Sequence, residues 1–332
     1  MTEPRPPDKH HAVPTHPVHA LLPAMAKQLV GLDSLIERLL IALLCKGHIL
    51  IEGPPGVAKT RTIKQFSQLI DTRFVRIQAT PDLLPADITG GDIFHQPSAE
   101  FRFVAGPLFN NIVLVDEINR APPKVQSALL EAMGEAQVST TGTTRKLDEL
   151  FLVAATQNPI EHEGTYPLPE AQLDRFMFFV QLALPEIHNE RLILDQVLAE
   201  QSLDEHNEAK TEPAIGVHDV LDARVAVRDV FISDAVRDYI VRLTGATRGL
   251  GMGAPSAGEI AHAASPRASI NLALAAQAKA WLALRNFVEP ADVAQLAPDV
   301  LSGRIVLDYR ARAEGGTARD VVKRIVENTP QV

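Results

Sequence analysis

The chain has 332 residues, of which 46% are hydrophobic, and it carries a formal net charge of −9. This length suffices for two domains with buried cores, and no apolar run is long enough to cross a membrane or to form the core of a signal peptide. A single cysteine, Cys45, excludes a disulfide scaffold, and the acidic balance argues against an extended nucleic-acid interface. We therefore expect a soluble cytoplasmic protein that does not bind nucleic acid.

The order of the predicted elements indicates an α/β fold. Residues 1–17 are polar and proline-rich, and we predict a disordered arm whose histidines lack the fixed spacing of a metal site. Residues 35–45 have helical amphipathicity. Strand-like runs then alternate with helical segments, at residues 48–52, 74–78, 111–115, 150–156 and 177–182. This alternation predicts a parallel sheet with helices on both faces.

The turn after the first predicted strand has the composition of a triphosphate-binding loop. It is rich in glycine and proline, ends in Lys-Thr and leads into a helical segment. Its backbone N–H groups would face phosphate oxygens, Lys59 would reach the outer phosphates, and Thr60 would hold Mg²⁺. The predicted ATP-binding residues are Gly53, Pro54, Pro55, Gly56, Val57, Ala58, Lys59, Thr60 and Arg61. Taken alone, the segment could also be an ordinary strand-to-helix turn.

Ala58 departs from the Walker A pattern, which has glycine at this position. If the backbone needs a positive φ here, alanine costs free energy because its Cβ disfavours the left-handed conformation. If the residue lies in the first turn of the helix, alanine costs nothing. The sequence leaves both conformations open.

Residues 111–117 form an apolar run that ends in two acids, Asp116 and Glu117. A continuous apolar run is typical of a parallel strand buried on both faces, so the acids lie at its carboxyl end, where open α/β sheets bind ligands. Asp116 would hold Mg²⁺ and Glu117 would polarise the attacking water as general base. An ordinary strand end that meets solvent is the alternative for this segment alone.

Asn158 follows a third apolar run, residues 151–156. If this strand inserts between the other two, the Asn158 amide would lie beside the acids and could orient the attacking water. A lone Asn-Pro pair is otherwise a turn signal.

Two hairpin-like insertions and a helical region complete the pattern. The first insertion spans residues 94–104, which alternate around a polar turn. The second spans residues 135–147, where Thr-Thr-Gly-Thr at 140–143 is a turn signal between short strands. From residue 185 onward, helical stretches such as 186–201, 233–244 and 268–284 predominate, and residues 204–213 read as a loop. We predict an all-α region there.

These motifs together resemble those of the MoxR-type AAA+ ATPases. The matching stretches are residues 53–60, Val-Asp-Glu-Ile-Asn-Arg at 115–120, Ala-Thr-Gln-Asn-Pro at 155–159 and Gly-Thr-Tyr-Pro-Leu-Pro-Glu-Ala-Gln-Leu-Asp-Arg-Phe at 164–176. Alanine before the lysine is a usual variation in that family. Leu32 stands where the family has glutamine, and residues 301–305 replace a more basic lid segment. The change in composition after residue 184 and the resemblance together predict a disordered arm at 1–17, an AAA+ P-loop core over 18–184 and a smaller all-α lid domain over 185–332.

The resemblance also implies roles for three polar residues. Asn158 resembles the sensor-1 residue, Arg175 the arginine finger that reaches a neighbouring subunit's γ-phosphate, and Arg267 the sensor-2 arginine of the lid. The rigid fork of arginine suits the charge that develops on phosphoryl oxygens. Without the resemblance, Arg175 could be a surface arginine paired with Asp174 or Glu170, and Arg267 a solvated residue at a helix start. A homo-hexameric ring and a partner protein with a von Willebrand factor A domain are further implications.

We therefore expect an ATPase that uses Mg²⁺ and couples hydrolysis to the remodelling, maturation or activation of a partner protein. Two alternatives stay open. The first is a chelatase-type AAA+ motor subunit, which inserts a metal into a cofactor and shares the Asp-Glu-Ile-Asn-Arg motif at residues 116–120. A nucleotide-gated scaffold with little turnover is disfavoured because Lys59, Asp116 and Glu117 are all present.

Overall fold

The computed structural model describes residues 13–26, 28–97, 99–140, 142–158, 165–202, 214–256 and 258–331. The chain divides into two compact units, which we describe separately. An α/β unit comprises Ala20–Val220, and a helical unit comprises the described residues up to His19 and those from Leu221 onward. Within the described ranges, no helix is both long and apolar enough to span a bilayer.

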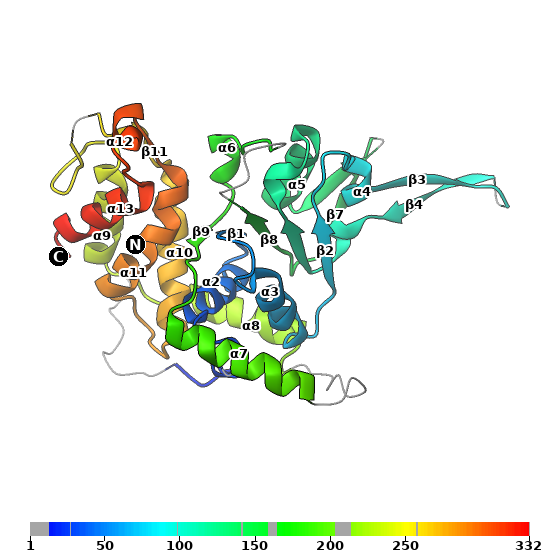
Figure 1. The fold of residues 1–332 in the computed structure, drawn as a ribbon, viewed down its shortest axis with the longest axis horizontal. Coiled ribbons are helices and arrows are strands. Elements are labelled where there is room, and N and C mark those ends of the chain that lie inside the picture. The colour runs from blue at the N-terminus through cyan, green and yellow to red at the C-terminus, as the bar shows by residue number, and fades with distance from the viewer. Residues whose placement is uncertain are drawn as a thin grey trace, which may run out of the picture. The chain divides into compact units, whose positions relative to one another are not determined.

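A five-stranded parallel sheet forms the centre of the α/β unit (Figure 1). Its order is β2-β5-β8-β1-β9, so β8 lies between β5 and β1. This confirms the predicted parallel sheet and the predicted insertion of the third run between the other two. The strands are β1 (Ile49–Glu52), β2 (Phe74–Gln78), β5 (Ile112–Asp116), β8 (Leu152–Gln157) and β9 (Phe178–Gln181).

Helices cover both faces of this sheet. One face, which includes Val113 and Val115, packs on α5 (Pro123–Glu135). The opposite face lies under α2 (Asp33–Leu44) and α3 (Lys59–Gln68), which contact β1 and β5. Because β5 is covered on both sides, all of its residues are buried, which explains its unbroken apolar sequence. The other helical elements of the unit are α1 (Leu21–Ala26), α4 (Pro85–Thr89), η2 (Pro107–Phe109), η3 (Ile118–Arg120), α6 (Glu170–Leu173) and α7 (Ile187–Ser202).

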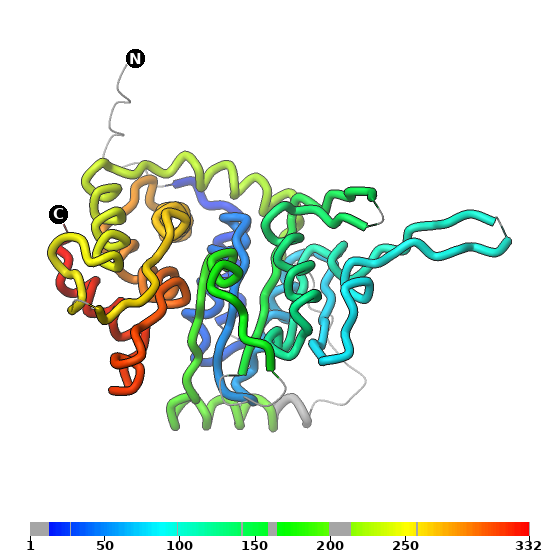
Figure 2. The backbone as a smooth tube through the Cα atoms, turned by 90° about the horizontal axis from the view of Figure 1, so that it is seen from above, coloured from blue at the N-terminus to red at the C-terminus, as the bar shows by residue number. Residues whose placement is uncertain are grey.

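Both predicted hairpins are present in the α/β unit. The first pairs β3 (Gly90–His95) with β4 (Glu100–Ala105), and the second pairs β6 (Gln137–Thr140) with β7 (Thr143–Lys146). Figures 1 and 2 show that the first hairpin extends away from the sheet and its helices. Its outer half therefore has few neighbours, and the Phe101 side chain near its tip is 72% exposed.

The helical unit packs its helices around Trp281 and Tyr239, which are almost completely buried. Its main contacts join α10 (Pro266–Leu282) to α11 (Pro290–Leu301), with α9 (Asp234–Ala246) and α13 (Ala318–Asn328) packed beside them. A short antiparallel strand pair adds to the predicted helical architecture. The other elements are η1 (Pro17–Ala20), α8 (Val217–Arg228, which begins in the α/β unit), β10 (Ile260–His262), η4 (Ser302–Arg304), β11 (Val306–Leu307) and α12 (Tyr309–Ala313).

The division between the units differs from the boundary at residue 184 that the change in composition predicted. It falls after Val220, because α7 packs on the α/β unit. The Gln196 amide donates a hydrogen bond to the Gln28 carbonyl at 3.0 Å, and Asn189 lies directly over Gly31.

The end of the predicted disordered arm is ordered within the helical unit. Val13 N–H donates to the Leu284 carbonyl at 3.2 Å, and the His19 ring lies 4.2 Å from the Trp281 ring, centroid to centroid. Burial of apolar ring surface and these hydrogen bonds offset the entropy cost of fixing residues 13–17. Residues 1–12 and the predicted loop at 204–213 lie outside the described residues.

Candidate functional site

The carboxyl ends of three neighbouring parallel strands meet at one cavity of the α/β unit. The predicted phosphate loop follows β1, Asp116 ends β5 with Glu117 directly after it, and Asn158 directly follows β8. Because β8 lies between β5 and β1, residues more than a hundred positions apart come together. The cavity has a volume of about 400 Å³ and is lined by Pro55, Gly56, Val57, Ala58, Lys59, Thr60, Arg61, Arg76, Gln78, Asp116, Glu117, Thr156 and Asn158.

The predicted phosphate loop has the backbone shape of an anion cradle. Gly56 and Ala58 both have positive φ, at 84° and 55°, and α3 begins directly afterwards at Lys59. The N–H groups of the first helical turn point along the helix axis toward this end, and with the helix dipole they give the start of α3 a positive potential. The Lys59 ammonium donates to the Gly53 carbonyl at 2.6 Å and lines the same cavity. An anion there would meet both kinds of donor.

The φ of Ala58 decides between the two conformations that the sequence left open. The residue is left-handed rather than part of the first helical turn. Its Cβ therefore costs about 1–2 kcal/mol relative to an unstrained backbone.

Asp116 is buried at the end of β5, with 6% of its surface exposed. Its Oδ2 accepts from Arg76 Nε at 2.6 Å and from Thr60 Oγ1 at 3.2 Å, and its Oδ1 accepts from Thr156 Oγ1 at 3.0 Å. A carboxylate beside a hydroxyl is the kind of oxygen pair that small divalent cations prefer. The predicted Mg²⁺ residues, Thr60 and Asp116, are thus in direct contact in the lining of the cavity.

Glu117 turns sharply out of the strand. Its φ is +56°, and its N–H donates to Thr156 Oγ1 at 3.0 Å, so the Thr156 hydroxyl joins the two acids. The Glu117 carboxylate accepts from Gln78 Nε2 at 3.0 Å and from Arg120 Nη1 at 3.1 Å. These donors hold the predicted general base at the wall of the cavity.

Asn158 also lines the cavity and is only 9% exposed. It lies beyond the end of β8, where the sequence placed it next to the acids. Pro159 and Gly164, which belong to the matching motifs around it, lie outside the described residues.

Four residues that contact the two acids were given no role from the sequence. Arg76, Gln78 and Thr156 line the cavity, and Arg120 donates to Glu117. Arg76 and Gln78 are two residues apart on β2, so their side chains point to the same side of the sheet, away from Ile77, which is buried in the core. The Arg-Ile-Gln alternation was a signal that could have identified them.

Arg175 is not among the residues lining this cavity. It is exposed, follows α6, and its Nη1 donates to the Leu130 carbonyl in α5. A Cβ at Gly134 would approach the Arg175 guanidinium at 3.2 Å, so this glycine leaves space for the arginine on α5.

Arg267 lies in the helical unit, in the first turn of α10. Its N–H donates to the Ser265 hydroxyl at 3.2 Å, so Ser265 caps the helix as its sequence position suggests. The predicted sensor role stays a prediction.

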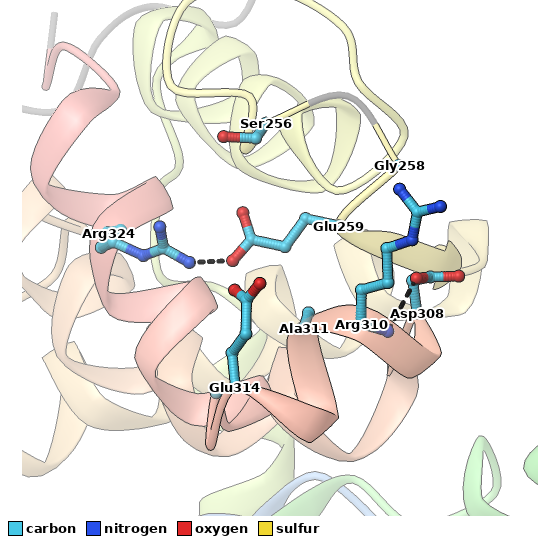
Figure 3. Close-up of a pocket in the computed structure, with 9 residues that line it drawn as sticks. Ser256, Gly258, Glu259, Asp308, Arg310, Ala311, Glu314 and Arg324 are labelled. Carbon is cyan, nitrogen blue, oxygen red and sulfur yellow. Dashed lines mark hydrogen bonds and ion pairs between the residues drawn. The ribbon is translucent and has the colours of Figure 1, made fainter.

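A larger cavity, of about 740 Å³, lies in the helical unit (Figure 3). Figure 3 shows Glu259 facing Arg324, with which it forms an ion pair, and Glu314 pointing toward the same space. Asp308 Oδ1 accepts from the Arg310 N–H at 2.9 Å and so caps α12. Charges of both signs line this cavity, and it contains none of the predicted site residues.

Comparison with known proteins agrees with this geometry. The profile of the ATPase family associated with various cellular activities (AAA) matches residues 48–178, and the AAA lid domain profile matches residues 256–325. Chaperone MoxR1 of Mycobacterium tuberculosis is 42% identical over 97% of this chain and 84% of its own length. The YeaC protein of Bacillus subtilis is 44% identical over 90% of this chain and 89% of its own.

A solved structure shows the same fold. The crystal structure of a proposed ATPase from Cytophaga hutchinsonii superposes with a TM-score of 0.85 at 41% identity, covering 95% of this chain and 94% of that one. The sequence-based family prediction is confirmed: this chain belongs to the MoxR family of AAA ATPases.

Proposed function

We propose that this protein binds ATP in the cavity at the carboxyl ends of β1, β5 and β8, hydrolyses it with Mg²⁺, and uses the energy to remodel or activate a partner protein. The convergence of the Lys59 ammonium, the Thr60–Asp116 oxygen pair and the Glu117 carboxylate in one cavity carries this proposal. The chaperone name of MoxR1 supports the partner-directed role.

Each residue has a distinct task in this scheme. The N–H groups at the start of α3 and Lys59 bind the phosphates, while Thr60 and Asp116 hold the metal, which when bound neutralises charge on the phosphoryl oxygens. Glu117 takes a proton from the attacking water and Asn158 orients that water. All of these groups lie at strand ends or at a helix start, and such rigid elements hold side chains in more precise positions than loops do.

Assembly completes the proposed site. Arg175 does not line the cavity of its own chain, and it is exposed, so in a ring it would serve the nucleotide of a neighbouring subunit. This placement supports a ring. Its being a homo-hexamer, and the action of Arg267 from the lid on the nucleotide, are proposed from the resemblance to the MoxR-type ATPases. The arginine finger generally contributes 10³–10⁵-fold to hydrolysis by stabilising transition-state charge, which is about 4–7 kcal/mol.

An ATPase assay on matched variants tests the chemistry. Lys59→Ala should abolish ATP binding, because the phosphates lose their cation. Glu117→Gln should bind ATP but hydrolyse it about 10²–10⁴-fold more slowly. Lys64→Ala, an exposed lysine on the same helix, should behave as the wild type. Near-normal turnover by Glu117→Gln would remove the general-base assignment, and a wild-type chain that binds ATP without turnover would favour the nucleotide-gated scaffold.

We propose that the partner is a protein with a von Willebrand factor A domain, held through the hairpin of β3 and β4. Phe94 and Phe101 face each other across this hairpin with ring centroids 5.3 Å apart, and both are at least half exposed. An exposed aromatic pair on a projecting element is typical of a binding surface. To be driven by hydrolysis, the partner must bind the nucleotide states with different affinities.

Capture of the partner by the Glu117→Gln protein in ATP tests this assignment. Phe101→Ser should weaken capture by about tenfold or more while leaving basal hydrolysis intact, because the residue lies outside the cavity. Tyr309→Ser, which removes an aromatic ring of matching 75% exposure in the helical unit, is the control. Loss of hydrolysis with intact capture would instead place the hairpin in the ring or the ATP site. Capture of an enzyme that inserts metals into cofactors would favour the chelatase alternative.

A further inference from the structure

The predicted metal-holding carboxylate already has a cation bound to it. Arg76 Nε donates to Asp116 Oδ2 at 2.6 Å, the shortest of the hydrogen bonds described for that carboxylate. The same oxygen accepts from Thr60, the other residue predicted to hold Mg²⁺. Arg76 is therefore bound to an oxygen that the metal would need.

The two members of this pair differ in their freedom to move. The Asp116 side chain is 8% exposed and fixed by Thr156, whereas the Arg76 side chain is 53% exposed. A buried carboxylate is costly without a counter-charge, so some cation must accompany it in every state. The arginine can swing into solvent on its long stem, and the aspartate cannot follow.

The arginine is also connected to the predicted general base. Its Nη2 donates to Gln78 Oε1 at 3.0 Å, and Gln78 Nε2 donates to Glu117 Oε2 at 3.0 Å. Departure of Arg76 would remove the bond that fixes the Gln78 amide, and with it one restraint on the Glu117 carboxylate.

We propose that Arg76 is the resident counter-cation of Asp116 in the nucleotide-free chain and that arrival of the metal–nucleotide complex displaces it. This inference rests on the proposed function, since it takes Thr60 and Asp116 as the metal-holding pair. Because the metal must break the Arg76–Asp116 ion pair in order to bind, part of its binding free energy is lost. Arg76 therefore reduces the factor by which metal strengthens nucleotide binding. Through Gln78, the same displacement loosens Glu117 only once the metal is in place.

Nucleotide affinity with and without metal tests the proposal. Isothermal titration with the non-hydrolysable analogue AMP-PNP would give the ratio of Kd in EDTA to Kd in MgCl2 for each protein. In Arg76→Gln this ratio should rise by about tenfold. In this variant the Kd with metal should fall, because the metal no longer has to displace a cation. The Kd without metal should rise, because the phosphates then meet the uncompensated negative charge of Asp116. A tenfold effect is what a charged hydrogen bond contributes after allowance for the half-exposed arginine.

Arg73→Gln is the matched control. Arg73 also pairs with an aspartate, Asp148, but lies outside the cavity lining, so its ratio should equal that of the wild type. If Arg76→Gln fails to fold, Arg76→Met keeps the apolar stem without the charge, and the same rise is expected.

Other results would overturn the inference. Equal weakening of binding with and without metal would show that Arg76 grips phosphate directly, and an unchanged ratio would show that it is a bystander. Absence of any nucleotide binding by the wild-type chain would overturn the proposed function itself, which is a different result from an unchanged ratio in a chain that binds.

Discussion

Ala58 and Glu117 both hold the backbone in the left-handed region at the edge of the candidate site. Their φ values are 55° and 56°, in a region that residues other than glycine rarely adopt. In each case the turn serves an adjacent feature: Ala58 precedes the first residue of α3, and Glu117 leaves β5 so that its N–H reaches Thr156. Strain of about 1–3 kcal/mol per residue is stored where the ligand is expected to bind.

Replacing Ala58 with glycine should release part of this strain. We expect the free energy of unfolding to rise by up to about 1 kcal/mol, because the relieved strain exceeds the 0.4–1 kcal/mol of added unfolded-state entropy. Chemical denaturation would measure the change, with nucleotide affinity expected to stay within a few-fold of the wild type. Ala121→Gly, at a buried alanine with φ of −69°, should instead destabilise by about 1–2 kcal/mol. Similar losses in both variants would contradict strain at Ala58.

Most cavity residues could be predicted because each motif is a contiguous run at the end of a strand. Arg76 and Gln78 could not be assigned in the same way, since their contacts depend on which strands are neighbours. Gln78 is in register with Asp116 across the β2–β5 pair, although they are 38 positions apart in the chain. The sequence also could not tell the φ of Ala58, because alanine is compatible with a helix start and, at a cost, with the left-handed region.

At the scale of single elements, α11 owes its start to a buried ion pair. Asp292 accepts from Arg285 Nη2 at 2.6 Å and Nη1 at 2.8 Å, and also from the Glu289 N–H at 2.9 Å, which caps the helix. The hydrogen bonds that Arg285 donates to Asp292 raise the pKa of the Arg285 guanidinium above its ordinary value. One carboxylate thus closes the loop between α10 and α11.

Asp292→Asn should therefore destabilise the helical unit by about 2–3 kcal/mol, because it leaves a partly buried arginine without its bidentate partner. The expected readout is a lower midpoint in thermal unfolding followed by circular dichroism. Asp234→Asn removes an exposed partner, 92% accessible, from a pair with Arg237 and should cost less than about 1 kcal/mol. Equal effects of the two changes would show that burial does not strengthen the Arg285–Asp292 pair.

Elements with a clear period were predictable, and elements without one were not. The five sheet strands and the first hairpin follow continuous or alternating apolar patterns, and the second hairpin is marked by the Thr-Thr-Gly-Thr turn signal at residues 140–143. α8 was missed because its pattern is interrupted: Arg224 is buried on the inner face and Val225 is exposed. The β10–β11 pair has strands of three and two residues, which is too short for any pattern to show.

At the scale of the whole molecule, the predicted arginine finger, Arg175, does not line the nucleotide cavity of its own chain. Arg175 lies on the outside of the α/β unit, with its guanidinium donating to the Leu130 carbonyl near the carboxyl end of α5. The guanidinium is thus held against α5 and not at the cavity of its own chain. Because Arg175 does not line the cavity of its own chain, its proposed function must be tested in mixtures of different subunits.

Arg175→Ala should bind nucleotide normally but lose hydrolysis by about 10³-fold or more, as removal of an arginine finger generally does. Mixing it with Lys59→Ala, which is also inactive, should restore part of the activity. Some interfaces then join an intact nucleotide pocket to an intact Arg175. The matched control mixes Arg175→Ala with a chain that carries both Lys59→Ala and Arg175→Ala. This mixture should restore no activity, because no subunit then has Arg175. Steady-state phosphate release would report each mixture, with subunit exchange verified by energy transfer between labelled chains. If exchange is complete and the first mixture stays as inactive as the control, Arg175 does not act across the interface and the ring model for this site fails.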